Sequence, residues 1–275
     1  MVLKGFNEET PLEEYKIKGR SVWVKRDDLM GDSVNLPPWG KIHAVYNLIN
    51  EVVDKTRPLV ILVIPNSYTA LAISAICDEL GIELHLCYSN SSKINMDELN
   101  SIKERFPKVT LNPIMPNVLM VMKGLTRMYS DTINGQTLPY AFEHELYKET
   151  FTQRIKPYSD KFDNLVVSSG AGVTMSGLVR GFMETELNEF WSQSKRQVWT
   201  TILSTELAIS RIIKKNGFQN LNINLHVSEY DLQDTMDWYK TPFPCNAYWD
   251  KKQWYWLENN IDKLEGEILF WNIGG

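Results

Sequence analysis

The sequence has few cysteines and no spacing typical of a metal site. Its three cysteines, Cys77, Cys87 and Cys245, include no Cys-x-x-Cys pair, and an odd number cannot be fully paired in disulfides. The first two lie in apolar patterns, which predicts buried free thiols in a reducing compartment. The four histidines show no metal-ligand spacing and are interpreted as structural or surface residues. No metal ion is therefore predicted.

Long apolar runs and a strong excess of either charge are also missing. No run reaches the length of a membrane span, and the N-terminal MVLKGFNEET lacks the apolar core of a signal peptide. The formal net charge of -5 argues against a broad footprint for duplex nucleic acid, although it leaves a local basic groove open. We expect a cytoplasmic protein with no membrane partner, whose 43% hydrophobic content provides a large core.

Strand-like and helix-like segments alternate along most of the chain. Strands are predicted at 21–26, 58–65, 82–88, 108–114, 164–169, 198–204, 222–227 and 267–273, and helices at 41–53, 68–81, 96–106, 117–131, 145–155, 174–183, 205–217 and 251–264. This order predicts an α/β fold with two lobes, each a mostly parallel sheet flanked by helices. The smaller lobe is predicted at 41–135, and the larger at 1–40 and 136–275.

A turn of small residues follows the apolar strand NLVVSS. It consists of Gly170, Ala171, Gly172, Val173 and Thr174, and a helix is predicted directly after it. Backbone N–H groups crowd together in such a turn and can hold a phosphate, aided by the helix dipole. No Gly-Lys-Ser/Thr follows, so this is not a Walker loop. A phosphate site and a merely tight turn are both compatible with the pattern.

A second junction between strand and helix carries Asn66, Ser67, Tyr68 and Thr69. Such polar residues often do no more than cap a helix. However, both junctions lie at the carboxyl ends of predicted strands, where α/β proteins usually bind ligands.

Lys41 opens the helix at 41–53, where its positive charge opposes the helix dipole. One interpretation is an ordinary surface lysine. Together with the small-residue turn and the polar junction, however, the lysine suggests pyridoxal phosphate (PLP). The aldehyde of this cofactor forms a Schiff base with a lysine, and its phosphate needs N–H donors.

Five segments support a family resemblance. These are TPLEEYKIKGRSVWVKRDDL, WGKIHAVYNLI, NSYTALAISAICDELGI, SSGAGVTMSGL and EGEILFWNIGG. In this order along nearly the whole chain, they resemble the fold type II, or tryptophan-synthase-β-like, PLP enzymes. The more specific resemblance is to the branch of 1-aminocyclopropane-1-carboxylate deaminase and D-cysteine desulfhydrase.

The resemblance implies roles for the residues singled out above. Lys41 would carry the Schiff base, and the turn at 170–174 would bind the phosphate. The family's asparagine against the cofactor ring aligns with Ser67, unless Asn66 has shifted into its place. The substrate carboxylate would be received by Ser67, Tyr68 and Thr69, of which Ser67 and Tyr68 also count as catalytic.

Further roles and departures concern the C-terminal part. In PCNAYWDKK, Tyr248 would be a catalytic acid or base and Asp250 the partner of the ring nitrogen. A core role for Tyr248 and a helix N-cap for Asp250 are the alternatives. The family's histidine is replaced by Tyr68 and its terminal threonine by Ile273.

The predicted function is PLP-dependent deamination or elimination on a small α-amino acid, by a homodimer. One alternative is a decarboxylase or lyase that acts on an amino acid attached to a larger molecule, such as a hypermodified viral DNA base. Only under that alternative would nucleic acid be a partner. The other is a PLP-binding protein without turnover.

Overall fold

The computed structural model describes residues 9–31, 36–64, 67–89, 96–115, 118–184, 196–202, 206–230 and 234–274. The chain forms two compact units. The first unit comprises Met1–Phe6, Gly31–Pro37 and Val45–His144, and the second comprises Asn7–Met30, Pro38–Ala44 and Glu145–Gly275. Lys41 thus belongs to the second unit, whereas the division predicted from the sequence begins the smaller lobe at this residue.

The second unit is built on a six-stranded sheet in the order β1-β2-β10-β7-β8-β9. Its strands are β1 (Leu12–Ile17), β2 (Arg20–Arg26), β7 (Asn164–Ser169), β8 (Gln197–Ile202), β9 (Ile223–Val227) and β10 (Ile268–Asn272). Only the edge pair of β1 and β2 is antiparallel. The sequence prediction missed β1, because the alternation of LEEYKI is too short and too polar to suggest a strand by itself.

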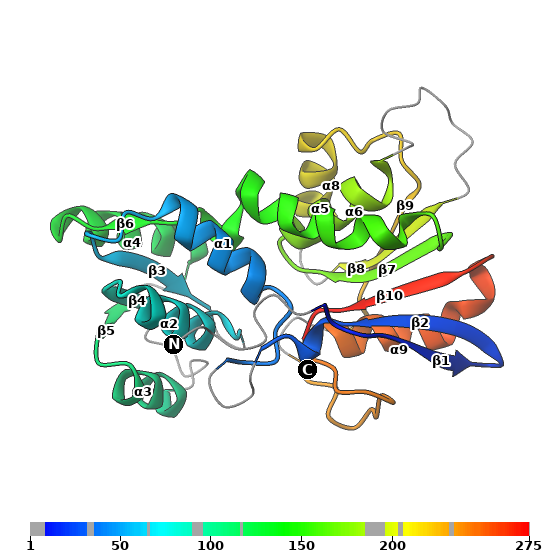
Figure 1. Ribbon diagram of the computed structural model, residues 1–275, viewed down its shortest axis with the longest axis horizontal. Helices are drawn as coiled ribbons and strands as arrows, with labels where there is room; N and C mark the ends of the chain where they lie inside the picture. Colours follow the sequence, from blue (N-terminus) through cyan, green and yellow to red (C-terminus); the bar gives the residue numbers. More distant parts are fainter. Residues whose placement is uncertain are drawn as a thin grey trace. The chain divides into compact units, whose positions relative to one another are not determined.

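Helices cover both faces of this sheet (Figure 1). On one face lie α5 (Glu145–Ser159) and α6 (Val173–Phe182), and on the other lies α9 (Asp250–Asn260). The remaining helices are α8 (Glu206–Lys215) and the short η1 (Asp27–Leu29) and η3 (Ile261–Lys263). Every residue of β7 and β10 is buried, as expected for central parallel strands covered on both sides.

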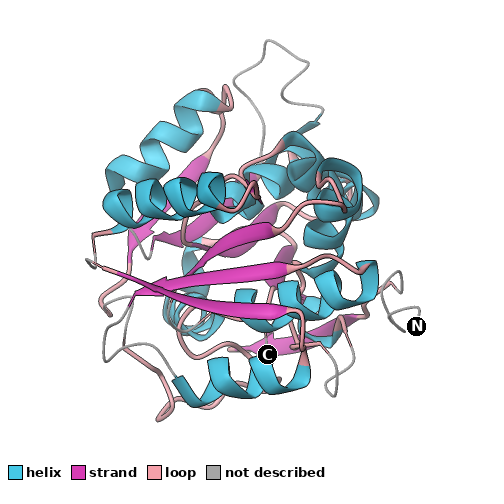
Figure 2. Ribbon diagram, turned by 90° about the vertical axis from the view of Figure 1, so that its left-hand side faces the viewer, coloured by secondary structure: helices cyan, strands magenta, loops and turns pink. Residues whose placement is uncertain are grey.

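The first unit has a four-stranded parallel sheet in the order β5-β4-β3-β6. Its elements are α1 (Ile42–Val52), whose first three residues belong to the second unit, and β3 (Leu59–Val63), α2 (Thr69–Leu80), β4 (Leu84–Ser89), α3 (Met96–Arg105), β5 (Val109–Ile114), α4 (Leu119–Thr132), β6 (Gln136–Thr137) and η2 (Tyr140–Phe142). Figure 2 shows helices beside the strands throughout the described chain. The predicted α/β fold with parallel sheets flanked by helices is confirmed.

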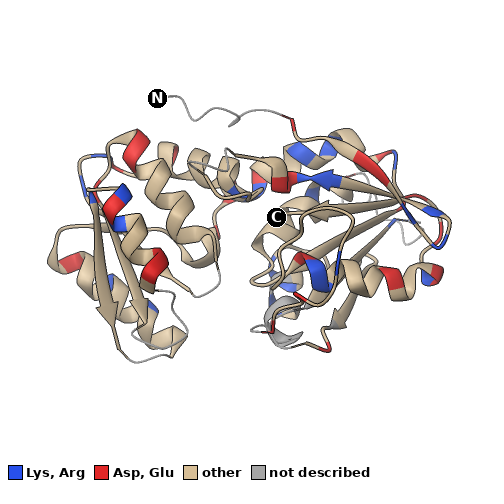
Figure 3. Ribbon diagram, turned by 90° about the horizontal axis from the view of Figure 1, so that it is seen from below, with Lys and Arg blue, Asp and Glu red and all other residues tan. Residues whose placement is uncertain are grey.

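Lysines and arginines are interspersed with acidic residues in both units (Figure 3). Cys77, Cys87 and Cys245 are buried free thiols, as predicted. No helix in the described part of the chain has both the length and the apolar character needed to span a membrane.

The contact between α5 and α6 is unusually close because glycine lies at the crossing. A Cβ atom added to Gly177 would lie 2.5 Å from the backbone oxygen of Lys148 and 2.9 Å from Cβ of Phe151. Real Cβ atoms do not approach other atoms this closely, so a side chain here would push α5 away. The close approach fixes the start of α6 relative to α5.

Gly177→Ala should therefore lower the melting temperature, because overpacking of a core typically costs about 1–3 kcal/mol. Gly124→Ala is the matched control, since nothing lies within 4 Å of the added Cβ on α4. There, better helix propensity should raise stability by about 0.5–1 kcal/mol. Calorimetry of both variants checks the pair, and equal shifts in the same direction would contradict the packing argument.

Candidate active site

Three neighbouring strands of the second unit end at one edge of its sheet. These strands are β2, β10 and β7, which run parallel to one another. They are followed by η1, by Ile273 and Gly274, and by the turn at 170–172. The carboxyl ends of parallel strands are the usual ligand sites of α/β sheets, so this edge is the candidate active site.

The turn that carries Lys41 is held to the end of β10. The N–H of Gly40 donates to the oxygen of Ile273 at 2.6 Å, and Trp39 forms a β-bridge with Gly274. Helix α1 begins directly after Lys41. The backbone on both sides of the lysine is therefore fixed, which limits where its amine can reach.

Asp27 packs closely against Gly40 in the same turn. A Cβ atom on Gly40 would lie 2.5 Å from Cβ of Asp27, so only glycine fits before the lysine. The buried Asp27 carboxylate accepts hydrogen bonds from Arg154 at 2.5 Å and from the indole N–H of Trp271 at 2.7 Å. The motif Lys-Arg-Asp-Asp therefore contributes a buried carboxylate that supports the lysine turn.

Asp250 is fixed to the ends of two strands. Its Oδ1 accepts a hydrogen bond from the Ser168 hydroxyl at 2.7 Å, and its Oδ2 accepts one from the N–H of Gly274 at 3.1 Å. Trp249 is the N-cap of α9 and Asp250 its first residue, with no side-chain capping bond. The N-cap interpretation of Asp250 is therefore wrong, because the carboxylate points to the sheet edge.

Lys41 and Asp250 affect each other electrostatically. Burial lowers the pKa of the Lys41 amine from 10.5, and the negative charge of Asp250 acts against this shift. Lys41 keeps partial solvent contact, but the protein around it displaces enough water for burial to dominate. Burial raises the pKa of Asp250 to about 6, while the Ser168 hydrogen bond and the Lys41 charge oppose the rise. A lysine with a lowered pKa is a better nucleophile at neutral pH.

The small-residue turn has the geometry of an anion cradle. Gly172 is the N-cap of α6 and has a φ of 77°, a conformation that favours glycine. Gly170 lies against Trp249, whose ring would be 2.7 Å from an added Cβ. The buried hydroxyl of Ser169 has no hydrogen-bond partner among the described residues. The turn, the start of α6 and this hydroxyl together fit a phosphate.

The last two residues of the predicted phosphate turn belong to the helix. Val173 and Thr174 form the first positions of α6, and both are buried. Ala171 is exposed and lies between the two glycines. Five consecutive residues thus offer a turn followed by free helical N–H groups, the arrangement that binds phosphate elsewhere.

The polar junction belongs to the first unit. The hydroxyls of Ser67 and Thr69 are hydrogen-bonded to each other at 2.7 Å, and Tyr68 is the N-cap of α2 without a side-chain capping bond. Ser67 also accepts the N–H of Thr69 at 3.3 Å. Asn66 lies outside the described residues. The junction is thus a small hydroxyl-lined turn in which Ser67 accepts the first N–H of α2.

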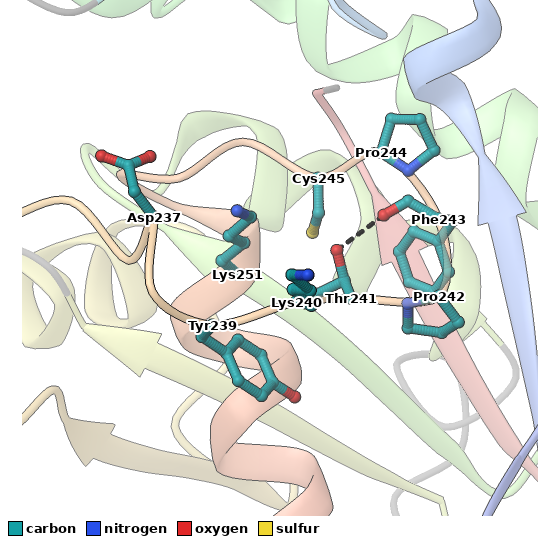
Figure 4. A pocket seen from close by; sticks show the side chains of 9 residues that line it. All are labelled: Asp237, Tyr239, Lys240, Thr241, Pro242, Phe243, Pro244, Cys245 and Lys251. Carbon is teal, nitrogen blue, oxygen red and sulfur yellow. Dashed lines mark hydrogen bonds between the residues drawn. The ribbon is translucent and has the colours of Figure 1, made fainter.

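Tyr248 is half-buried and lies two residues before α9, and its N–H donates to the side-chain oxygen of Asn246. A cavity of about 520 Å³ lies beside this segment, lined by Asp237, Tyr239, Lys240, Thr241, Pro242, Phe243, Pro244, Cys245 and Lys251. Figure 4 shows that the lining side chains come from the loop at 237–245 and from Lys251 at the start of α9. Lys251 therefore lines this cavity, whereas its neighbour Asp250 is hydrogen-bonded to the strand ends.

Sequence reasoning missed Ser168 and Gly274 as partners of Asp250. Ser168 is the second-last residue of the buried strand β7, which gave a weak signal, but it lies 82 residues from Asp250 in the chain. Gly274 acts through its backbone N–H, which no side-chain pattern reveals. Sheet order, not local sequence, brings these groups together.

Several solved structures resemble the chain over almost its whole length. An L-serine ammonia-lyase from Rhizomucor miehei matches with a TM-score of 0.66 and 14% identity, covering 98% of this chain and 93% of that one. A hydrogen sulfide-producing enzyme from Fusobacterium nucleatum matches with a TM-score of 0.68 and 13% identity, covering 96% and 93%. The chain has the type II fold of PLP enzymes.

Proteins with other activities are also similar. Serine racemase from Dictyostelium discoideum matches with a TM-score of 0.67 and 12% identity, covering 98% of this chain and 92% of that one. Among curated proteins, the glycyl-dTMP PLP-dependent decarboxylase of Pseudomonas phage M6 is 24% identical over 284 residues, covering 96% of this chain and 98% of that protein. The chain matches no protein-family model. The deaminase and desulfhydrase branch within the type II fold stays a prediction.

The raised pKa of Asp250 predicts a pH-dependent stability. The folded protein retains the Asp250 proton up to about pH 6, whereas an ordinary aspartate loses it near 3.8. Because the folded protein holds this proton more tightly than the unfolded chain, the proton adds to the free energy of unfolding. The contribution is fully present below about pH 4 and is lost as the pH rises to about 6. Relative to Asp250→Asn, the wild type should lose roughly 2–3 kcal/mol of unfolding free energy across this window. Urea unfolding of the cofactor-free proteins measures this, and a constant difference between them would contradict it.

Proposed function

We propose that this protein is a PLP-dependent decarboxylase that acts on an amino acid joined to a deoxythymidine nucleotide. The observation that carries the proposal is that Asp250 and the turn before Lys41 are both hydrogen-bonded to the end of β10, where the charges of Lys41 and Asp250 influence each other. The chain is also similar along its length to a decarboxylase of glycyl-dTMP. The relative supplies the substrate class, and the geometry supplies the groups for the chemistry.

The residues at the sheet edge fit the cofactor. The turn from Gly170 to Gly172, with the Ser169 hydroxyl, would hold the phosphate, and the Lys41 amine would hold the aldehyde. Asp250, ionised above about pH 6, would accept a hydrogen bond from the pyridine N–H. Bound PLP supplies an electron sink for the bond that breaks at the α-carbon.

In decarboxylation, the bond between the α-carbon and the carboxylate breaks, CO₂ leaves, and a proton takes its place. Lys41 is suited to deliver that proton, since its lowered pKa makes the ammonium a stronger acid than a surface lysine. Asp250 would help by keeping a proton on the ring nitrogen, because its negative charge favours the positive ring.

The residues of the polar junction offer only neutral groups to a carboxylate. Ser67, Tyr68 and Thr69 would receive the carboxylate with hydroxyl groups, and the sequence IPNSYT contains no cationic side chain. Hydrogen bonds from neutral hydroxyls hold an anion less tightly than charged groups do. A weakly held carboxylate loses less stabilisation when it becomes neutral CO₂. Tyr248 would serve as a second acid or base.

A second candidate is elimination or deamination of a free α-amino acid. It is favoured by the ammonia-lyase and the hydrogen sulfide-producing enzyme that share the fold. Both candidates use Lys41 and the phosphate turn in the same way. They differ in which bond at the substrate breaks, so product analysis separates them.

Cofactor attachment is tested by reduction. The protein loaded with PLP should absorb as a lysine adduct, and borohydride should fix the label on the peptide containing Lys41, as found by mass spectrometry. Lys41→Ala should lose the label, whereas Lys251→Ala, which changes a lysine beside Asp250, should keep it. A label on another lysine of the wild type would refute the assignment.

The reaction is tested with glycyl-dTMP in heavy water. We expect release of CO₂ and a product that keeps its nitrogen and gains one deuterium at the α-carbon. Lys41→Ala should show no turnover above background. Release of ammonia from serine, without CO₂ from glycyl-dTMP, would instead support the second candidate.

A further inference from the structure

Two buried hydroxyls connect α5 to the start of α6. The phenol of Tyr147 lies 2.9 Å from Oγ1 of Thr174, within hydrogen-bonding distance. Tyr147 is 1% exposed and Thr174 8%. The close crossing at Gly177, one turn further along α6, holds the two helices at the distance that this contact needs.

The direction of this hydrogen bond determines what Thr174 can offer a ligand. A threonine hydroxyl has one proton and two lone pairs. If it donated to Tyr147, no proton would remain for an anion. A phenol is the stronger acid of the two and so the better donor. With Tyr147 as donor, Thr174 is the acceptor and its own proton is free to point elsewhere.

Thr174 stands where such a proton is useful. It is the second residue of α6, two positions after Gly172 at the end of the turn. Burial raises the pKa of Tyr147 far above 10, so the phenol keeps its proton at any physiological pH. The phenol is therefore not an anion that could only accept a hydrogen bond from Thr174.

We propose that Tyr147 is a positioning residue for the cofactor phosphate, because its hydrogen bond to Thr174 directs the Thr174 proton to the phosphate. This inference rests on the proposed function, since it requires that PLP binds at the turn. It assigns a role to α5, an element with no part in the sequence-based site.

The test compares two ligands that differ only in the phosphate. Affinities of the cofactor-free protein for PLP and for pyridoxal are measured by titration of the absorbance. Tyr147→Phe should weaken PLP roughly threefold to tenfold, the effect of one hydrogen bond, and leave pyridoxal unchanged. The phenylalanine ring retains the packing against Phe151, whose ring centre lies 5.3 Å away, so the fold is preserved.

Variants of Thr174 complete the cycle. Thr174→Val should weaken PLP at least as much, and adding Tyr147→Phe to it should cause no further loss. Thr174→Ser keeps the hydroxyl and should restore nearly full affinity for PLP.

The matched control is Tyr158→Phe, on the same helix. Tyr158 is also buried, but its hydroxyl is hydrogen-bonded to Lys25 at 2.9 Å and to Glu9 at 2.6 Å. This variant should lose stability without changing the ratio of the two affinities.

The outcomes separate the two proposals. If Tyr147→Phe weakens both ligands equally, or neither, Tyr147 has only a structural role and the inference is overturned. If the wild-type protein binds neither PLP nor pyridoxal, the proposed function itself fails.

Discussion

The candidate site depends on the backbone at the end of β10. The oxygen of Ile273 accepts the N–H of Gly40, and the N–H of Gly274 donates to Asp250. Two chain segments more than 200 residues apart are thereby attached to consecutive residues of one strand end. Because backbone groups make both bonds, the side chain at 273 need not be polar. This explains how the chain retains the arrangement with isoleucine where the resembling family has threonine.

Two of the three buried carboxylates near this strand end form ion pairs with arginines. Asp27 is balanced by Arg154 at 2.5 Å, and Asp28 by Arg26 through two hydrogen bonds of 2.8 and 2.7 Å. Asp250 has only neutral donors and the more distant charge of Lys41. A buried carboxylate without a close cation is costly to ionise, so the pKa of Asp250 is raised. Asp27 and Asp28, by contrast, each have a close arginine. The unbalanced carboxylate is the one beside the lysine, as expected for a functional group.

Much of the fold could be predicted from the sequence, because buried parallel strands give continuous apolar runs. NLVVSS and EILFWNI were found in this way, within a residue or two of β7 and β10. The edge strand β1 was missed, since its pairing with β2 supplies what its own pattern lacks. At the site, Lys41 and the small-residue turn carry local signals. The partners of Asp250 do not, because strand order brings Ser168 and Gly274 to it.

The contact between Gly40 and Asp27 constrains how this chain can change over time. Any side chain at position 40 meets the Cβ of residue 27, which every amino acid except glycine carries. Replacing Asp27 with another acidic or amide residue therefore gives no relief, and it disturbs the contacts to Arg154 and Trp271. The two positions can diverge only through an intermediate that has glycine at 27 and has lost its buried anion. A residue larger than glycine before the lysine therefore requires the backbone around Asp27 to move.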